Sequence, residues 1–318
     1  MVIFNPSKAT DPAARKEEIL AAVRAAGLPE PQWLETTVDD PGREMLGAAL
    51  ADGADLVLAC GGDGTVRACV AALDGSDVPL AILAAGTGNL LAGNLDIPDD
   101  LTEALALVSG DTLRRIDVGA AGDERFAVMG GLGFDAAMIA DANEDLKARI
   151  GWAAYILSGA RNLRRPPARY TLTLADGHRV ERTARGVLVG NVGKLEAGIP
   201  VLPDARPDDG LLDIAVLAPA TLRDWAALAL RVVRRRRPER RMFETFRSAS
   251  VRVEVRPPQP FELDGDSCGT TDDVTITLGA RHLSIYAPTT STTSAPSTTS
   301  AASTTSTAST ASTVEERP

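Results

Sequence analysis

The sequence predicts an α/β fold in which a parallel sheet is followed by a β-rich half. In the first third of the chain, short apolar runs alternate with helical patterns, as in parallel sheets covered by helices. Beyond residue 117, many short strand-like segments follow one another with turns between them, as in antiparallel sandwiches or barrels. We therefore expect a Rossmann-like parallel-sheet domain at 1–117 and a mainly antiparallel β-sandwich domain at 118–288, with the option that the last strand packs back on the first domain.

The individual elements follow from apolar runs and helical spacing. In the first domain we expect strands at Val2–Phe4, Asp55–Cys60 and Leu80–Ala84, and helices at Pro12–Ala26, Val66–Leu73 and Leu90–Leu95. In the second we expect strands at Phe126–Met129, Tyr170–Leu174, Val187–Gly190, Leu212–Leu217, Val251–Arg256, Val274–Leu278 and Leu283–Tyr286, and helices near Ala142–Asn162 and Leu222–Arg236. The dipeptide Asp176-Gly177 predicts a hairpin turn.

Composition excludes several classes of protein. Of 318 residues, 44% are hydrophobic and 24% charged, which is typical of a globular protein. The formal charge of −10 provides no global basic field for nucleic acid, so we expect no nucleic-acid partner. Residues 289–313 contain 19 Ser or Thr, and a segment of that composition buries no core. We therefore expect 289–318 to be a disordered tail.

The cysteines and the start of the chain indicate the compartment. Cys60, Cys69 and Cys268 have neither disulfide nor zinc-ligand spacing, which favours a reducing cytosol. The sequence contains no run of 18 apolar residues, and it opens directly on a strand-like segment rather than a secretory signal. We expect a cytoplasmic protein.

Two glycine-rich turns carry the first chemical signal. Gly61–Thr65 lies between an expected strand and an expected helix, an arrangement that presents backbone N–H groups and a helix N-terminus to phosphate. Glycine permits both the turn and the close approach of a phosphate oxygen. Asp63 would repel phosphate unless a cation or a substrate hydroxyl lies between. The alternative is a tight turn in which Asp63 caps the helix.

Gly86–Asn89 repeats this arrangement one strand later, and Asn5-Pro6 follows the first strand. Because the carboxyl ends of parallel strands share one edge of a sheet, we expect all three turns to converge there. The sequence has no Gly-x-x-x-x-Gly-Lys-Ser/Thr stretch, so the phosphate site is not a P-loop.

Asn5-Pro6, Gly61–Thr65 and Gly86–Asn89, in that order, resemble the diacylglycerol kinase catalytic-domain family, which includes bacterial soluble lipid kinases and sphingosine kinases. The resemblance continues through Ile116–Gly119, Gly131–Asp135, Pro203–Asp213 and Leu263–Asp266. The Gly-Gly-Asp-Gly motif alone is shared with NAD kinases and phosphofructokinases. The later motifs select the lipid branch.

The resemblance implies ATP and Mg²⁺ as cofactors and phosphoryl transfer to a lipid hydroxyl, giving phosphatidic acid when the lipid is diacylglycerol. The ATP-binding residues that it implies are Asn5, Pro6, Thr36, Gly61, Gly62, Asp63, Gly64, Thr65, Gly86, Thr87 and Asn89. Asp63 and Asp117 resemble catalytic-network aspartates, and Asp266 stands where the family usually has a glutamate as general base. A structural Mg²⁺ site is implied at Arg206, Asp209 and Leu211.

The sequence departs from the family pattern at three places. Arg67-Ala68 replaces the usual Asn-Glu, Lys8-Ala9 replaces the usual Ser-Gly, and Asp266 is one methylene shorter than glutamate. Lys8 and Arg67 offer new partners for phosphate oxygens. Two alternatives therefore stay open: an NAD kinase-like kinase, and a catalytically weak lipid- or nucleotide-binding protein.

Access to a bilayer would come from a local basic segment. Arg223–Arg247 holds nine arginines against three acidic residues, a local net charge of +6, and its first part is apolar at helical spacing. This pattern predicts an interfacial helix on an anionic membrane surface, while a core-packed helix with a basic end is the alternative. We expect peripheral membrane association, and a homodimer is one option for the oligomeric state.

Overall fold

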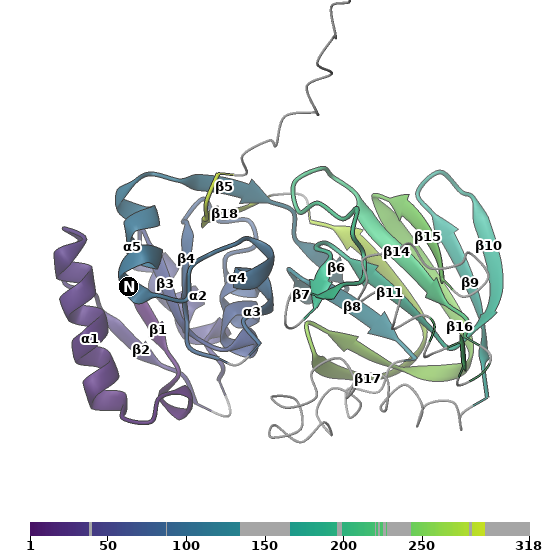
Figure 1. Ribbon diagram of the computed structural model, residues 1–318, viewed down its shortest axis with the longest axis horizontal. Helices are drawn as coiled ribbons and strands as arrows, with labels where there is room; N and C mark the ends of the chain where they lie inside the picture. The colour runs from purple at the N-terminus through teal and green to yellow at the C-terminus, as the bar shows by residue number, and fades with distance from the viewer. Residues whose placement is uncertain are drawn as a thin grey trace, which may run out of the picture.

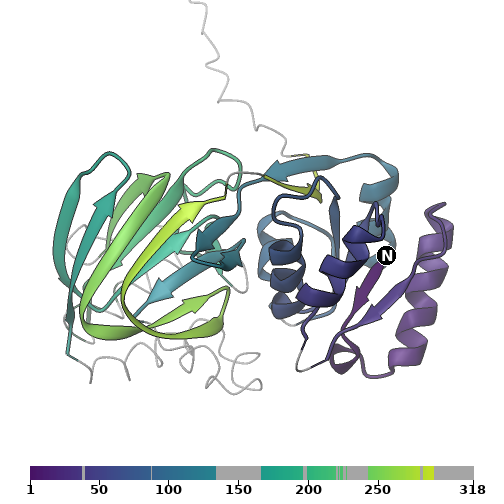
Figure 2. The same cartoon turned by 180° about the vertical axis from the view of Figure 1, so that it is seen from behind.

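The computed structural model describes residues 1–37, 40–86, 88–133, 166–195, 199–219, 243–279 and 282–289, together with positions 221, 223, 224 and 227. Within them the chain forms two lobes, one a parallel sheet with helices on it and the other built of antiparallel strands (Figure 1, Figure 2). The predicted helix near Ala142–Asn162, most of that near Leu222–Arg236, and the tail from residue 290 lie outside the described residues.

The first lobe is a six-stranded sheet in the order β2-β1-β3-β4-β18-β5. Its strands are β1 (Val2–Phe4), β2 (Trp33–Glu35), β3 (Val57–Gly61), β4 (Leu80–Ala84), β5 (Leu113–Ile116) and β18 (Leu283–Tyr286). Its helices are η1 (Pro6–Lys8, a 3₁₀ turn), α1 (Pro12–Ala25), α2 (Arg43–Ala51), α3 (Asp63–Ala72), α4 (Leu90–Asn94) and α5 (Leu101–Ser109). All pairs are parallel except β5 with β18.

Both faces of this sheet are buried. Val2 and Phe4 of β1 pack in one core with Ile19 of α1, whereas Ile3 packs in another with Leu46 of α2. Successive side chains of a strand point to opposite faces, so a sheet covered on both faces needs apolar residues at every position. The continuous apolar runs in the sequence meet this requirement.

The three strands and three helices predicted in this lobe are confirmed within two or three residues at each end. Five elements were not predicted: β2, α2, α5, β5 and the 3₁₀ turn η1. β2 is an edge strand whose three residues are half-buried or exposed, so it gives no apolar run. β5 has the sequence Leu-Arg-Arg-Ile, and its pairing partner β18 comes about 170 residues later in the chain.

The second lobe is an antiparallel sheet whose main path is β15-β14-β11-β8-β16-β17-β6-β7, with β9 and β10 joined through β16. Its strands are β6 (Gly119–Ala121), β7 (Glu124–Phe126), β8 (Met129–Leu132), β9 (Ala168–Leu174), β10 (Arg179–Ala184), β11 (Gly186–Gly190), β14 (Leu212–Leu217), β15 (Phe243–Ser248), β16 (Ser250–Leu263) and β17 (Asp266–Leu278). β12 (Lys194–Leu195) and β13 (Ile199–Pro200) form a separate pair. Together these strands make the predicted β-sandwich, and the Asp176-Gly177 turn joins β9 to β10.

One predicted strand is wrong. Phe126–Met129 is not continuous, because β7 ends at Phe126 and β8 begins at Met129. Between them, the N–H groups of Ala127 and Val128 donate to the carboxylate of Asp264 instead of to a neighbouring strand. A side chain 136 residues away thus interrupts what the local apolar run predicts.

The last strand returns to the first lobe. β18 lies between β4 and β5, so the chain crosses between the lobes once after β5 and again before β18. Among the described residues, no helix has the length and apolar character needed to cross a membrane.

Candidate active site

The turn from Gly61 to Thr65 ends β3 and begins α3. A Cβ on Gly61 would lie 2.4 Å from Oγ1 of Thr65, which is buried, so only glycine fits beside this threonine. The N-cap residue of α3 is Gly62, and no side chain of the described residues caps this helix end. The first N–H groups of α3 are therefore not used by a capping side chain and can meet an anion.

The second glycine turn lies directly against the first. A Cβ on Gly86 would lie 2.8 Å from the Cα of Gly62, so the two backbones touch. The N–H of Leu90 donates to Oδ1 of Asp63 over 2.6 Å, and the N–H of Gly86 donates to Oδ1 of Asn89 over 3.0 Å. Asp63 thus ties the two turns together rather than capping α3, the alternative that we considered. Thr87 lies outside the described residues.

The turn after β1 joins the same edge. Nδ2 of Asn5 donates to Oγ1 of Thr65 over 3.3 Å, and Oδ1 of Asn5 accepts from the N–H and hydroxyl of Ser7, which holds Pro6 at the start of η1. Thr36, at the end of β2, is buried and its N–H donates to the carbonyl of Phe4. The structure therefore brings the ends of β1 to β4 together, at the edge where parallel sheets bind ligands.

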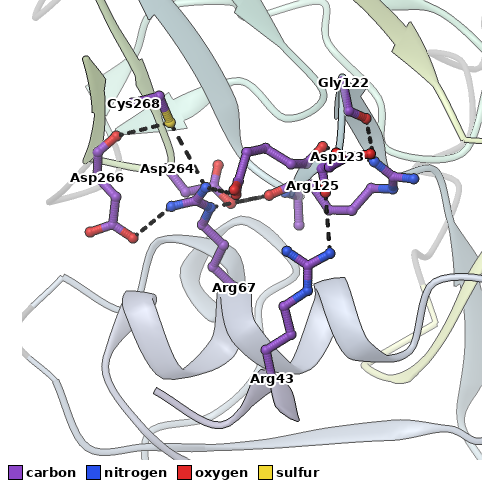
Figure 3. Close-up of polar contacts among 10 residues, drawn as sticks. Arg43, Arg67, Gly122, Asp123, Arg125, Asp264, Asp266 and Cys268 are labelled. Carbon is purple, nitrogen blue, oxygen red and sulfur yellow. Dashed lines mark hydrogen bonds and ion pairs between the residues drawn. The ribbon is translucent and has the colours of Figure 1, made fainter. Parts of the chain in front are cut away.

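Asp266 from the second lobe faces this edge. Its Oδ2 lies 4.0 Å from the position that a Cβ on Gly64 would occupy. The same oxygen accepts a hydrogen bond of 2.9 Å from Arg67, which lies on α3 (Figure 3). The acidic side chain that the resemblance assigns as general base thus lies over the first glycine turn.

A two-residue turn places Asp266 there. Leu263 pairs with Asp266 across the hairpin of β16 and β17, and the central residues Asp264 and Gly265 have φ of 49° and 88°. Both angles are positive, as a type I′ turn requires, and Asp-Gly is a favoured sequence for it. The carboxylate of Asp264 anchors the turn by accepting N–H bonds of 2.9–3.0 Å from Ala127, Val128 and Met129.

Sequence reasoning gave no role to Glu262, a buried carboxyl beside this turn. It is 4% exposed, and its Oε2 has no hydrogen-bond partner among the described residues. Burial, together with the nearby carboxylates of Asp264 and Asp266, raises the pKa of Glu262 to about 7. Burial also raises the pKa of Asp264 to about 6, although its three N–H bonds act in the opposite direction. Glu262 therefore keeps its proton to a higher pH than Asp264 does.

Asp117 lies where the chain crosses between the lobes. Its Oδ1 is 2.9 Å from Nδ1 of His282, and its Oδ2 accepts from the N–H of Gly210 over 2.8 Å. These contacts tie the loop around Gly210 to the start of β18. A place for Asp117 in a catalytic network with Asp63 and Asp266 stays a prediction, because none of its described contacts reaches either residue.

In the loop expected to hold Mg²⁺, the carboxylate of Asp209 already pairs with a positively charged side chain. Oδ2 of Asp209 pairs with the guanidinium of Arg247, which also lies 3.4 Å from Oδ2 of Asp213. Oδ1 of Asp209 accepts the N–H of Leu211 over 3.1 Å, so both oxygens of its carboxylate are engaged. The described residues contain no group of three His, Cys, Asp or Glu side chains that could hold a metal. Mg²⁺ at Arg206, Asp209 and Leu211 stays a prediction.

Comparison with known families accounts for most of the chain. The diacylglycerol kinase catalytic domain matches residues 1–121, and the YegS C-terminal NAD kinase beta sandwich-like domain matches residues 129–286. A Pseudomonas aeruginosa (strain UCBPP-PA14) protein named "Probable lipid kinase YegS-like" is 37% identical over 209 residues, which cover 64% of this chain and 68% of that protein. The chain belongs to the diacylglycerol kinase catalytic-domain family.

Solved structures agree with this family. A "putative diacylglycerol kinase" of Bacillus anthracis (strain Sterne) has a TM-score of 0.75 at 26% identity, over 90% of this chain and 94% of that one. An NAD kinase of Archaeoglobus fulgidus, solved with ATP, has a TM-score of 0.52 at 15% identity and covers 90% of this chain, which shows a shared fold. The resemblance stated from the sequence is thus confirmed.

Membership of this kinase family implies the use of ATP, and the glycine turns fit its phosphates. The backbones of Gly62 and Gly86, which carry no side chains, touch beside the uncapped N-terminus of α3. Lys8 lies at the same place, since its Cε is 3.5 Å from the position of a Cβ on Gly62. Of the residues that depart from the family pattern, Lys8 therefore places a positive charge next to the turn, whereas Arg67 pairs with Asp266.

Proposed function

We propose that this protein is an ATP- and Mg²⁺-dependent lipid kinase that transfers the γ-phosphate of ATP to the hydroxyl of diacylglycerol or a related lipid. The observation that carries the proposal is the position of Asp266 Oδ2, 4.0 Å from the place of a Cβ on Gly64. It puts a carboxylate of the β-rich lobe over the turn suited to phosphate. The lipid-kinase names of the relatives support the choice of a lipid acceptor.

The chain's own groups divide the work of phosphoryl transfer. The Gly62–Thr65 turn, the N–H groups at the start of α3 and Lys8 hold and neutralise the phosphates. ATP, when bound, supplies the phosphoryl group. The lipid hydroxyl oxygen forms a bond to the γ-phosphorus, the bond from that phosphorus to the bridging oxygen breaks, and ADP leaves. Asp266 accepts the hydroxyl proton, and such help accelerates reactions by roughly 10²–10⁴-fold.

The first experiment measures which acceptor is phosphorylated. Purified protein is given labelled ATP and magnesium with diacylglycerol, sphingosine, ceramide or NAD, and the labelled product is separated. Labelled phosphatidic acid is the expected result. Labelled NAD alone would favour the NAD kinase-like alternative, and ATP binding without any labelled product would favour a weak binding protein.

The second experiment tests the base. Asp266→Asn removes the carboxylate that accepts the proton, so we expect turnover to fall by at least about 10²-fold while calorimetry shows unchanged ATP binding. The matched control is Asp273→Asn, on the same strand β17, where the carboxylate pairs with Arg252 over 2.6 Å. Equal activity of the Asp266 variant and the wild type would remove the base assignment.

We also propose that the Arg223–Arg247 segment brings the enzyme to an anionic membrane surface. Among its described residues, Arg247 pairs with Asp209 and Glu244 pairs with Arg182. We assign the attraction to the arginine block Arg234–Arg237. Each basic residue near such a surface contributes about 1 kcal/mol. Replacing these four arginines with glutamine should abolish sedimentation with phosphatidylglycerol-containing vesicles, whereas Arg179→Gln should not. Binding that ignores salt and anionic lipid would contradict the proposal.

A further inference from the structure

Arg67 connects the first glycine turn to the second lobe. It lies three residues after Gly64, so the two residues lie on the same side of α3. Its guanidinium donates to Oδ2 of Asp266 over 2.9 Å, to Oε2 of Glu124 over 2.6 Å, and to the carbonyl of Arg125 over 3.1 Å (Figure 3). The same guanidinium also donates to Sγ of Cys268 over 3.9 Å, so one side chain of the first lobe makes four contacts with the second.

The guanidinium is held in one orientation by these contacts. The Arg67 side chain is only 14% exposed, and its three guanidinium nitrogens donate to four different acceptors. Partial burial disfavours its charge, yet Asp266, Cys268 and Glu124 together raise the pKa of Arg67 above its ordinary value. The guanidinium group of arginine is planar and rigid. Its bonds to Glu124 and to the carbonyl of Arg125 therefore also fix the position of Asp266, the carboxylate that it binds through its remaining nitrogen.

The group that is fixed is the proposed base. Asp266 is 54% exposed, and a short exposed carboxylate with no partner would rotate among several rotamers. Within the described part of the chain, the hydrogen bond that its carboxylate accepts is made by Oδ2, the same oxygen that lies 4.0 Å from the position of a Cβ on Gly64. One oxygen therefore serves as the anchor, and Oδ1 is the oxygen left to take a proton.

We propose that Arg67 is a positioning residue for phosphoryl transfer: it holds Oδ2 of Asp266 so that Oδ1 meets the acceptor hydroxyl above the Gly62–Thr65 turn. The proposal rests on the function proposed above. The hydroxyl proton moves to Oδ1, and Arg67 stays protonated throughout. Two of the three departures from the family pattern, Arg67 and Asp266, are thus in contact. The arginine compensates for a base that is shorter than glutamate by about 1.5 Å.

Arg67→Ala tests the proposal, with Arg43→Ala as the matched control. Arg43 lies on α2 and also crosses to the second lobe, but among the described residues it donates only to the carbonyl of Asp123, over 3.2 Å (Figure 3). We expect Arg67→Ala to lower kcat on the order of 10²-fold, as a base displaced by about 1 Å would, with KM for ATP nearly unchanged. Guanidinium ion at millimolar concentration should restore part of kcat. Arg43→Ala should leave kcat at the wild-type value.

A double variant separates positioning from structure. If Arg67 acts through Asp266, then Arg67→Ala together with Asp266→Asn is no slower than Asp266→Asn alone. A wild-type kcat in Arg67→Ala would overturn the proposal. So would a loss that guanidinium does not rescue and that adds fully to the loss from Asp266→Asn. Absence of lipid phosphorylation in the wild type, or full activity of Asp266→Asn, would instead refute the proposed function or its base.

Discussion

Replacing Glu262 with glutamine exchanges one carboxyl oxygen for an amide nitrogen and keeps the shape of the side chain. Glu262 is 4% exposed, its Oε2 has no hydrogen-bond partner in the part of the chain that the structure describes, and its pKa is raised from the ordinary 4.5 to about 7. Below pH 4.5 it is protonated in both the folded and the unfolded chain. Between pH 4.5 and 7 the folded chain keeps the proton that the unfolded chain loses, so stability falls as pH rises.

The size of this effect follows from the two pKa values. Each pH unit in that window lowers the free energy of unfolding by about 1.4 kcal/mol. The accumulated loss is about 3 kcal/mol at pH 7, and it stays constant at higher pH. Glutamine does not titrate, so its variant escapes this loss. At pH 5 the protonated carboxyl and the amide each leave one polar group without a partner, and the two proteins should be about equally stable.

Urea unfolding of both proteins at pH 5 and pH 8.5 measures the difference. We expect Glu262→Gln to be more stable by about 3 kcal/mol at pH 8.5 and nearly unchanged at pH 5. Asp264, whose pKa is raised to about 6, titrates in the same range but is present in both proteins. A stability difference that is the same at both pH values would refute the reasoning, because it would mean that Glu262 titrates like an exposed glutamate.

Three further predictions concern the turns. Gly61→Ala should weaken ATP binding roughly tenfold or more in calorimetry, because its Cβ would lie 2.4 Å from Thr65 Oγ1 and such overpacking costs about 1–3 kcal/mol. The control is Gly47→Ala, whose Cβ would have no described atom within 4 Å and which should be neutral or stabilising. Asp264→Ala should destabilise the protein to urea by about 3 kcal/mol or more, because three buried N–H groups lose their acceptor, and Asp264→Asn should cost less. Asp63→Ala should lower Tm more than Asp63→Asn, which keeps an oxygen for the N–H of Leu90; equal Tm values would contradict the tie between the turns.

Local patterns sufficed where neighbouring residues impose the geometry. The strand–glycine–helix units were predictable because the turn at Gly61 has room only for glycine beside Thr65, four residues away. Asp264-Gly265 is likewise a local signal, since both residues tolerate positive φ and the apolar strands on either side complete the hairpin. The order of these turns along the chain also indicated the family.

The sequence by itself therefore determined the turns, the parallel sheet and the residues that line its edge. Tertiary structure decided which of those residues meet: Arg67 and Asp266 are 199 positions apart, and Asp264 reaches amides 135–137 positions before it. Such contacts depend on the register of β8 with β16 and on how the two lobes pack, and no short stretch of sequence encodes either. The raised pKa of Glu262 also depends on tertiary structure, because burial raises it and only the assembled sheet buries this side chain.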